Sequence, residues 1–166
     1  MTDTTHALTP QELIEGSEEA ETSSPSESAS TARFLTFVSG GLTFGVPTDQ
    51  VIEIITNHNI RSLPLVPDYV RGIINLRGQI LPIIDVRLRL GKPFQEYTSS
   101  TCIIILDIGA DRIGIGVDSV SQVLTVDTAA ASPIPLENRQ KLATSMIATE
   151  EGKVVLLLDC NALTEP

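Results

Sequence analysis

The 166-residue sequence contains no tryptophan, and aromatic residues make up only 4% of it, although 42% of its residues are hydrophobic. Any core must therefore be built chiefly from valine, isoleucine and leucine. No apolar run reaches the ~18 residues that identify a membrane-spanning helix. The N-terminal residues also lack the basic start and apolar stretch of a secretory signal peptide. These absences predict a cytoplasmic chain that does not insert into a membrane.

Cysteine and histidine are equally scarce, with two of each. His6 and His58 lie far apart and have no Cys or His neighbours, which argues against a zinc site. Cys102 and Cys160 lie in or beside apolar runs, where small buried thiols are favoured over a disulfide. The glycine-rich patterns that bind nucleotides are missing as well. We therefore expect neither a metal nor a cofactor.

Basic residues are few, with 11 Lys and Arg against 21 Asp and Glu, which gives a formal net charge of −10. Seven of the acids and none of the cations fall in residues 1–32, so −10 − (−7) leaves −3 for residues 33–166. No basic stripe is available for a phosphate backbone, which excludes nucleic acid as a partner. The Glu-, Ser-, Thr- and Ala-rich composition predicts that residues 1–32 form a disordered acidic tail.

Short apolar, β-branched segments separated by Gly, Pro, Asn or Asp predict an all-β fold built from small barrels. Part of this pattern occurs twice. Residues 34–56 align with 103–125 at an offset of 69, and residues 78–85 align with 152–159 at an offset of 74. The repeat predicts two similar units, about residues 33–91 and 101–164, in one domain of residues 33–166. They should share an apolar core, because units of this size bury little surface alone.

The candidate catalytic groups have a simpler structural explanation. Asp85 and Asp159 occupy equivalent positions after a strand in each repeat, where a helix N-cap is expected. Repetition of the position favours capping over a catalytic carboxylate pair. His58 lies in a polar loop without an obvious nucleophile. The sequence therefore predicts a protein that binds partners and is not an enzyme.

The segment Asn-Leu-Arg-Gly at 75–78 predicts a turn between two apolar strands, with Arg77 at its tip. The equivalent residue in the second repeat is Glu151, so the repeated fold does not itself require an arginine. Two explanations stay open at this point. Arg77 either binds a partner or is a solvated residue paired with Asp85 or Glu53.

The segment from Pro67 to Arg87, PDYVRGIINLRGQILPIIDVR, resembles the signature of the CheW family. The stretches FLTFVSGGLTFGVPTDQVIEII (34–55) and VVLLLDCNAL (154–163) resemble the same family. The resemblance implies two five-stranded SH3-like β-barrels that share a hydrophobic core, with a few short helices. It also implies a non-catalytic adaptor of bacterial chemotaxis. Such adaptors couple chemoreceptors (methyl-accepting chemotaxis proteins) to the histidine kinase CheA, whose regulatory domain has the same double-barrel form.

The resemblance further implies where the partners bind. Cytoplasmic hairpin tips of chemoreceptors are expected in an apolar groove between the barrels. The matching receptor-binding positions are Val51, Glu53, Ile54, Arg77 and Val123, and the kinase-binding positions are Ile60 and Leu65. The protein is expected in the cytoplasm, recruited to membrane-associated receptor arrays. Two alternatives remain, a CheW-like adaptor of a type IV pilus or gliding pathway and a small-molecule sensor that uses the groove.

Overall fold

The computed structural model describes residues 7–8, 30–56, 58–109, 111–134 and 142–164. Most of the acidic tail thus lies outside the described residues. Within residues 1–32, the described part contains strand at residues 7–8 and 31–32. That residues 1–32 form a disordered tail stays a prediction. The first half of the chain contains β1 (Ala7–Leu8), β2 (Thr31–Ser39), β3 (Leu42–Pro47), β4 (Val51–Thr56), β5 (Val70–Leu76), β6 (Gln79–Asp85) and helix α2 (Val86–Arg89). The second half contains β7 (Cys102–Asp107), β8 (Arg112–Val117), β9 (Ser119–Asp127), β10 (Ser132–Pro133), β11 (Ala143–Ala148) and β12 (Val154–Leu158). Short 3-10 helices lie at Thr48–Gln50 (η2), Thr128–Ala130 (η3) and Cys160–Leu163 (η5).

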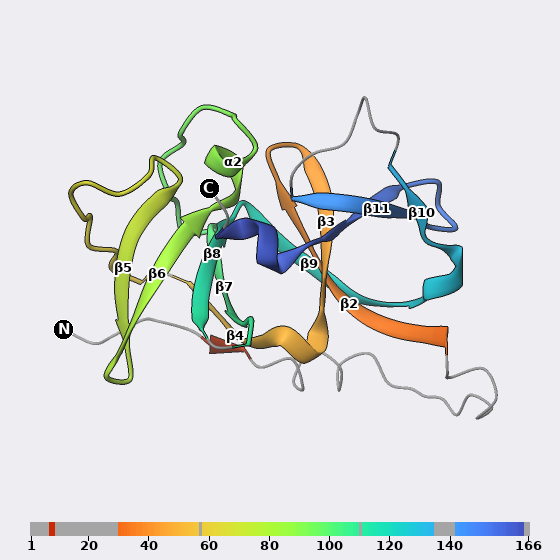
Figure 1. Ribbon diagram of the computed structural model, residues 1–166, viewed down its shortest axis with the longest axis horizontal. Helices are drawn as coiled ribbons and strands as arrows, with labels where there is room; N and C mark the ends of the chain where they lie inside the picture. Colours follow the sequence, from red (N-terminus) through yellow and green to blue (C-terminus); the bar gives the residue numbers. More distant parts are fainter. Residues whose placement is uncertain (1–6, 9–29, 57, 110, 135–141, 165–166) are drawn as a thin grey trace.

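The strands form two sheets that lie side by side (Figure 1). The first sheet has the order β1-β4-β7-β8-β6-β5, and the second has the order β10-β11-β12-β3-β2-β9. One edge strand of each sheet, β1 or β10, is only two residues long. The other five strands of each sheet form an SH3-like barrel. The predicted all-β class with two five-stranded barrels is confirmed.

The sheets do not divide the chain where the repeat suggested. The hairpin β2–β3 belongs to the first repeat but lies in the second sheet, and the hairpin β7–β8 of the second repeat lies in the first sheet. Each repeat therefore gives its hairpin to the sheet that holds the rest of the other repeat. The expected units of residues 33–91 and 101–164 are sequence repeats, but neither of them is a barrel.

The register of the sheets preserves the repeat. Phe37 pairs with Phe44 in β2–β3, and Leu106 pairs with Ile113 in β7–β8, each 69 residues further on. The two parallel pairings, β12 with β3 and β6 with β8, are related in the same way. The two barrels are thus copies at the level of individual backbone pairs.

The larger apolar cluster draws residues from both sheets. It contains Phe44 on β3 and Ile104 on β7, which are both completely buried. The Phe37 and Phe44 rings stack with their centroids 5.5 Å apart. A smaller cluster lies within the first sheet, beneath the β5–β6 hairpin. The shared core expected from the small size of each repeat is therefore present.

In the described part of the chain, no helix has the length and apolar character needed to span a bilayer.

Candidate partner-binding site

The β5–β6 hairpin ends in a two-residue loop formed by Arg77 and Gly78 (Figure 1). Both residues have positive φ, 52° at Arg77 and 86° at Gly78. Such a loop matches the twist of the paired strands but favours Asn and Gly. The Asn75 side chain supports it by accepting a hydrogen bond of 3.0 Å from the Gly78 N–H. An arginine in this left-handed conformation costs about 1 kcal/mol, so the turn alone does not explain Arg77.

Arg77 is paired with a buried carboxylate on β4, which is separated from β6 by β7 and β8 in the order of the sheet. Its Nη1 donates to Oε1 of Glu53 on β4. The Glu53 side chain is only 8% exposed, whereas that of Arg77 is 66% exposed. The hydrogen bond and the negative charge of Glu53 raise the pKa of Arg77. Of the two pairings that the sequence left open, the structure thus contains the one with Glu53.

The second Glu53 oxygen, Oε2, is buried and has no hydrogen-bond partner in the described structure. A buried acceptor without a donor is destabilising, so this atom marks a place where a partner could supply one. The ion pair borders a hollow of about 300 Å³. Its lining residues come from five strands and the β5–β6 turn and are Ile52, Glu53, Leu76, Arg77, Gln79, Leu81, Ile105 and Arg112. Ile80, which lies between two of these residues in sequence, is exposed on the opposite face of β6 and lines a different hollow.

The other predicted receptor-binding residues do not join this site. Val51 and Ile54 are buried in the larger core cluster, and Val123 is half-buried on β9 of the second sheet. Their burial makes Val51 and Ile54 core residues rather than an exposed surface. The structure therefore brings together only Glu53 and Arg77 of the five. The structure also places Arg112 in this site. The sequence did not indicate this, because Arg112 is on β8, which comes close to the hollow only through the pairing of the strands.

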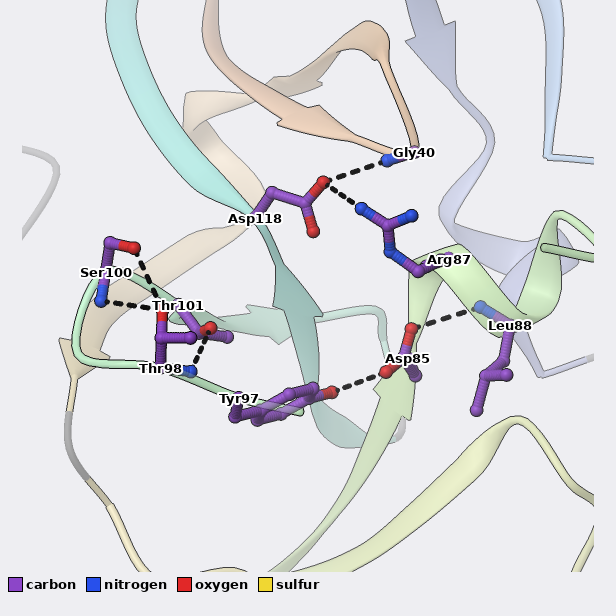
Figure 2. A network of polar contacts seen from close by, with 9 residues as sticks. All are labelled: Gly40, Asp85, Arg87, Leu88, Tyr97, Thr98, Ser100, Thr101 and Asp118. Atoms are coloured by element: carbon purple, nitrogen blue, oxygen red, sulfur yellow. Dashed lines mark hydrogen bonds and ion pairs between the residues drawn. The ribbon is translucent and has the colours of Figure 1, made fainter. Parts of the chain in front are cut away.

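Beside the shared apolar core, a network of polar contacts joins the two sheets (Figure 2). Asp118, between β8 and β9, accepts hydrogen bonds from the Gly40 N–H at 3.1 Å and from Arg87 Nη2 at 2.6 Å. Asp118 thereby joins the β2–β3 turn to helix α2. Nearby, Arg89 Nη2 donates to the carbonyl of Ala162 in η5. Ionic and hydrogen-bonding groups thus fix the two halves of the chain against each other.

Asp85 has the predicted capping role and a second one. Its Oδ1 accepts from the Leu88 N–H at 3.0 Å, which caps α2, and its Oδ2 accepts from the Tyr97 hydroxyl at 2.9 Å (Figure 2). Asp159 similarly caps η5. Burial, and then the charge of Asp85, raise the pKa of Tyr97. Tyr97 therefore stays a neutral donor that holds the segment between the repeats against the first sheet.

Replacing Tyr97 with phenylalanine should change how stability depends on pH. Because the folded pKa lies above the unfolded value of 10.0, unfolded chains lose this proton first as pH rises. The contribution of the neutral Tyr97 hydroxyl to the free energy of unfolding is therefore complete below pH 10 and is lost progressively above it. We expect the wild type to lose about 1 kcal/mol more than Tyr97→Phe between pH 8 and pH 11. Urea titrations at both pH values measure this, with Tyr69→Phe as the control, and equal losses in all three proteins would contradict it.

The predicted kinase-binding residues lie in the loop between β4 and β5. Leu65 is fully exposed, with a relative accessibility of 103%, and has φ of 59°. Leu63 is exposed on the same loop. Ile60 instead is half-buried and packs against the smaller core cluster. The loop thus presents leucines to solvent at one end and is anchored by Ile60 at the other.

Neither cysteine has the environment of a reactive or metal-binding thiol. Both are free thiols, Cys160 is buried, and burial raises its pKa to about 12. Its Sγ donates to Oε1 of Gln50 at 3.0 Å. Among the described residues, no group of three or more His, Cys, Asp or Glu side chains is placed to hold a metal ion.

Comparisons with known proteins show which family has this architecture. The family model described as the CheW-like domain matches residues 33–165. The chain belongs to the CheW family. It is 31% identical over 136 residues to the chemotaxis protein CheW of Bacillus subtilis, which covers 80% of this chain and 86% of that protein. It is 35% identical over 102 residues to CheW of Klebsiella aerogenes, with 61% of each chain covered. It is also 28% identical over 103 residues to the protein FrzA of Myxococcus xanthus, with 62% of this chain and 64% of that protein covered.

A solved relative has the same fold. The crystal structure of the scaffolding protein TtCheW from Thermoanaerobacter tengcongensis superposes with a TM-score of 0.72 at 26% identity, and the match covers 77% of this chain and 88% of that one. The CheW family consists of chemotaxis scaffolds, so membership confirms the expectation of a non-catalytic adaptor.

Proposed function

We propose that this protein couples the cytoplasmic hairpin tips of chemoreceptors to the regulatory domain of the histidine kinase CheA, in the cytoplasm at membrane-associated receptor arrays. One observation supports this most strongly. Among the described residues, Leu65 and Arg77 are the two that have a positive φ without being glycine. Both side chains are exposed, and they belong to the two sets expected to contact the two partners. Backbone strain that packing does not require tends to occur at functional positions.

The receptor site is proposed around the Arg77 hollow. A receptor helix can place apolar side chains against Ile52 and Leu76 while Arg77 pairs with a carboxylate or carbonyl of the helix. The unpartnered Oε2 of Glu53 can then accept a hydrogen bond from a donor on the same helix. Apolar contact supplies area, and the two charged groups fix the position of the helix along its axis.

Reversing the charge at the turn should abolish receptor coupling. We expect Arg77→Glu to weaken binding of receptor fragments at least tenfold, because two carboxylates would then meet at Glu53 and the cation would be lost. The melting temperature should also fall by several degrees while the fold is kept, because the buried Glu53 carboxylate loses its partner but the Arg77 side chain is itself exposed. Pull-down with receptor fragments and a thermal melt measure the two effects.

Arg33→Glu is the matched control, because Arg33 is an exposed arginine on β2 of the other sheet. Normal receptor binding by Arg77→Glu would refute the functional role of Arg77. A collapsed melt would show instead that the residue is structural.

The kinase site is proposed on the β4–β5 loop, with Leu65 as its exposed anchor. We expect Leu65→Asn to weaken binding to the CheA regulatory domain several-fold, because an exposed apolar contact is removed. The unfolding midpoint should stay the same or rise, because Asn tolerates positive φ better than Leu. Calorimetric titration with the isolated regulatory domain, paired with a urea melt, measures both quantities.

Leu63→Asn tests whether the effect is specific to Leu65, because Leu63 is exposed on the same loop without the positive φ. Unchanged affinity in the Leu65 variant would remove this loop from the kinase surface. A stability loss without an affinity loss would give Leu65 a purely structural role.

A further inference from the structure

We propose that the open seam of the second barrel, between β9 and the β11–β12 turn, is a docking site for an extended segment of a partner protein that carries lysine or arginine. This surface lies on the other sheet from the Arg77 hollow. It is separate from both surfaces proposed for the receptor and for the kinase.

The second sheet has a hollow of about 450 Å³ that is the repeat copy of the hollow around Arg77. Each of the eight residues that line the first hollow has an equivalent, shifted by 69 or 74 residues, that lines the second. β9 takes the place of β4, and the β11–β12 turn takes the place of the β5–β6 turn. The second hollow is therefore built into the repeated fold.

The second hollow lacks the ion pair that bridges the first. In the first barrel, Arg77 and Glu53 join the hairpin turn to β4. Their equivalents, Glu151 and Gln122, are both exposed, and no side-chain hydrogen bond or ion pair joins them in the described part of the chain. The second hollow is also the larger, about 450 Å³ against about 300 Å³. No side-chain contact thus bridges the gap between β9 and the β11–β12 turn, whereas the Arg77–Glu53 ion pair bridges the equivalent gap in the first barrel.

The charge of the rim is reversed between the two copies. Two arginines and one glutamate line the first hollow, whereas Asp127, Glu150, Glu151 and Lys153 line the second. Its apolar lining includes the buried side chains of Ile147 and Val155. An apolar side chain can therefore enter the hollow while a cation on either side of it meets the acidic rim.

The edge of β9 indicates that the occupant is extended. In the first sheet, β1 pairs antiparallel with the edge strand β4 at Ile54 and Ile55. The repeat equivalents, Val123 and Leu124 on β9, pair with β2 on one side, and β9 is the last strand of its sheet among the described residues. An unpaired edge can accept an added strand. Because side chains alternate along a strand, a segment that alternates apolar and basic residues fits both the hollow and the rim.

Two synthetic peptides test the proposal on the full-length protein. One is acetyl-Lys-Leu-Lys-Val-Lys-amide, and its matched control is acetyl-Glu-Leu-Glu-Val-Glu-amide. Titrated into the ¹⁵N-labelled chain, the basic peptide should shift amide resonances of residues 121–127 and 149–155, and the acidic peptide should not. The double variant Glu150→Gln/Glu151→Gln should raise the dissociation constant at least fivefold. The double variant Asp68→Asn/Glu96→Gln, which removes two exposed charges elsewhere, should leave it unchanged.

Three results would overturn the proposal. The basic peptide could produce no shifts, it could shift only the acidic residues 1–32, or both double variants could weaken it equally. Arg77→Glu should keep full affinity for the basic peptide. Loss of receptor coupling and loss of this second site are therefore measured separately, and either can fail without the other.

Discussion

Replacing Gly72 with alanine is expected to destabilise the protein by more than about 4 kcal/mol, which is a large part of the stability of an ordinary domain. Gly72 lies on β5 with φ of 147°, a conformation that side-chain-bearing residues rarely adopt. A Cβ atom there would lie 2.0 Å from the backbone oxygen of Arg61. That oxygen accepts the Ile73 N–H at 2.8 Å, so it cannot withdraw without breaking the bridge that holds the β4–β5 loop to the sheet.

Urea or thermal unfolding of Gly72→Ala measures this effect. Gly91→Ala is the matched control, because Gly91 also has positive φ, 81°, but a Cβ there would meet no atom within 4 Å. It should cost only about 1 kcal/mol, the conformational part of the penalty. Equal losses at the two positions would show that the contact with Arg61 is unimportant.

Separating the two repeats is expected to abolish folding altogether. The hairpin β7–β8 lies between β4 and β6 in the first sheet, and β2–β3 lies between β12 and β9 in the second. A fragment of residues 1–99 therefore lacks the middle of the first sheet and the flanking strands of the second, and a fragment of residues 100–166 lacks the flanking strands of the first sheet and the middle of the second. Each fragment alone should show no cooperative thermal transition and poorly dispersed NMR spectra, whereas an equimolar mixture should recover both.

The full chain with a protease site inserted between Ser99 and Ser100, both exposed, provides the control for the cut itself. After cleavage it should keep its fold until denatured. A single fragment that unfolds cooperatively would contradict the exchange of hairpins and would favour two independent units.

The local turns and most strands could be predicted because the signals for them are short. Gly40, Gly78 and Gly152 have the positive φ expected of turn glycines, and Asp85 caps α2 as its position indicated. Four strands did not stand out from the sequence. β1 and β10 are only two residues long, β4 follows directly on a turn, and β11 has no clear strand pattern. All four are edge or near-edge strands, whose pairing is fixed by distant partners.

The candidate site was only half predictable. Arg77 and Leu65 stood out from the sequence as residues that a family motif places in turns or loops. The burial of Val51 and Ile54 did not, because an alternating apolar pattern cannot show which face of a strand lies in the core once a bulge shifts the register, as between Val51 and Glu53. The contacts of Arg87 with Asp118 and of Tyr97 with Asp85 likewise join segments whose proximity follows only from the packing of the sheets.

By itself, the sequence determined the all-β class, the internal duplication, the family and the exposed arginine, because each of these rests on composition or on residues close together in the chain. The tertiary structure alone decided that the repeats exchange hairpins and that Glu53 is the buried partner of Arg77. It also decided that the second barrel has an acidic copy of the same hollow that no ion pair bridges. The reason is physical. Either hairpin could pair within its own repeat or with the other, and only the side-chain packing of the shared core selects between two pairings with the same backbone hydrogen bonds.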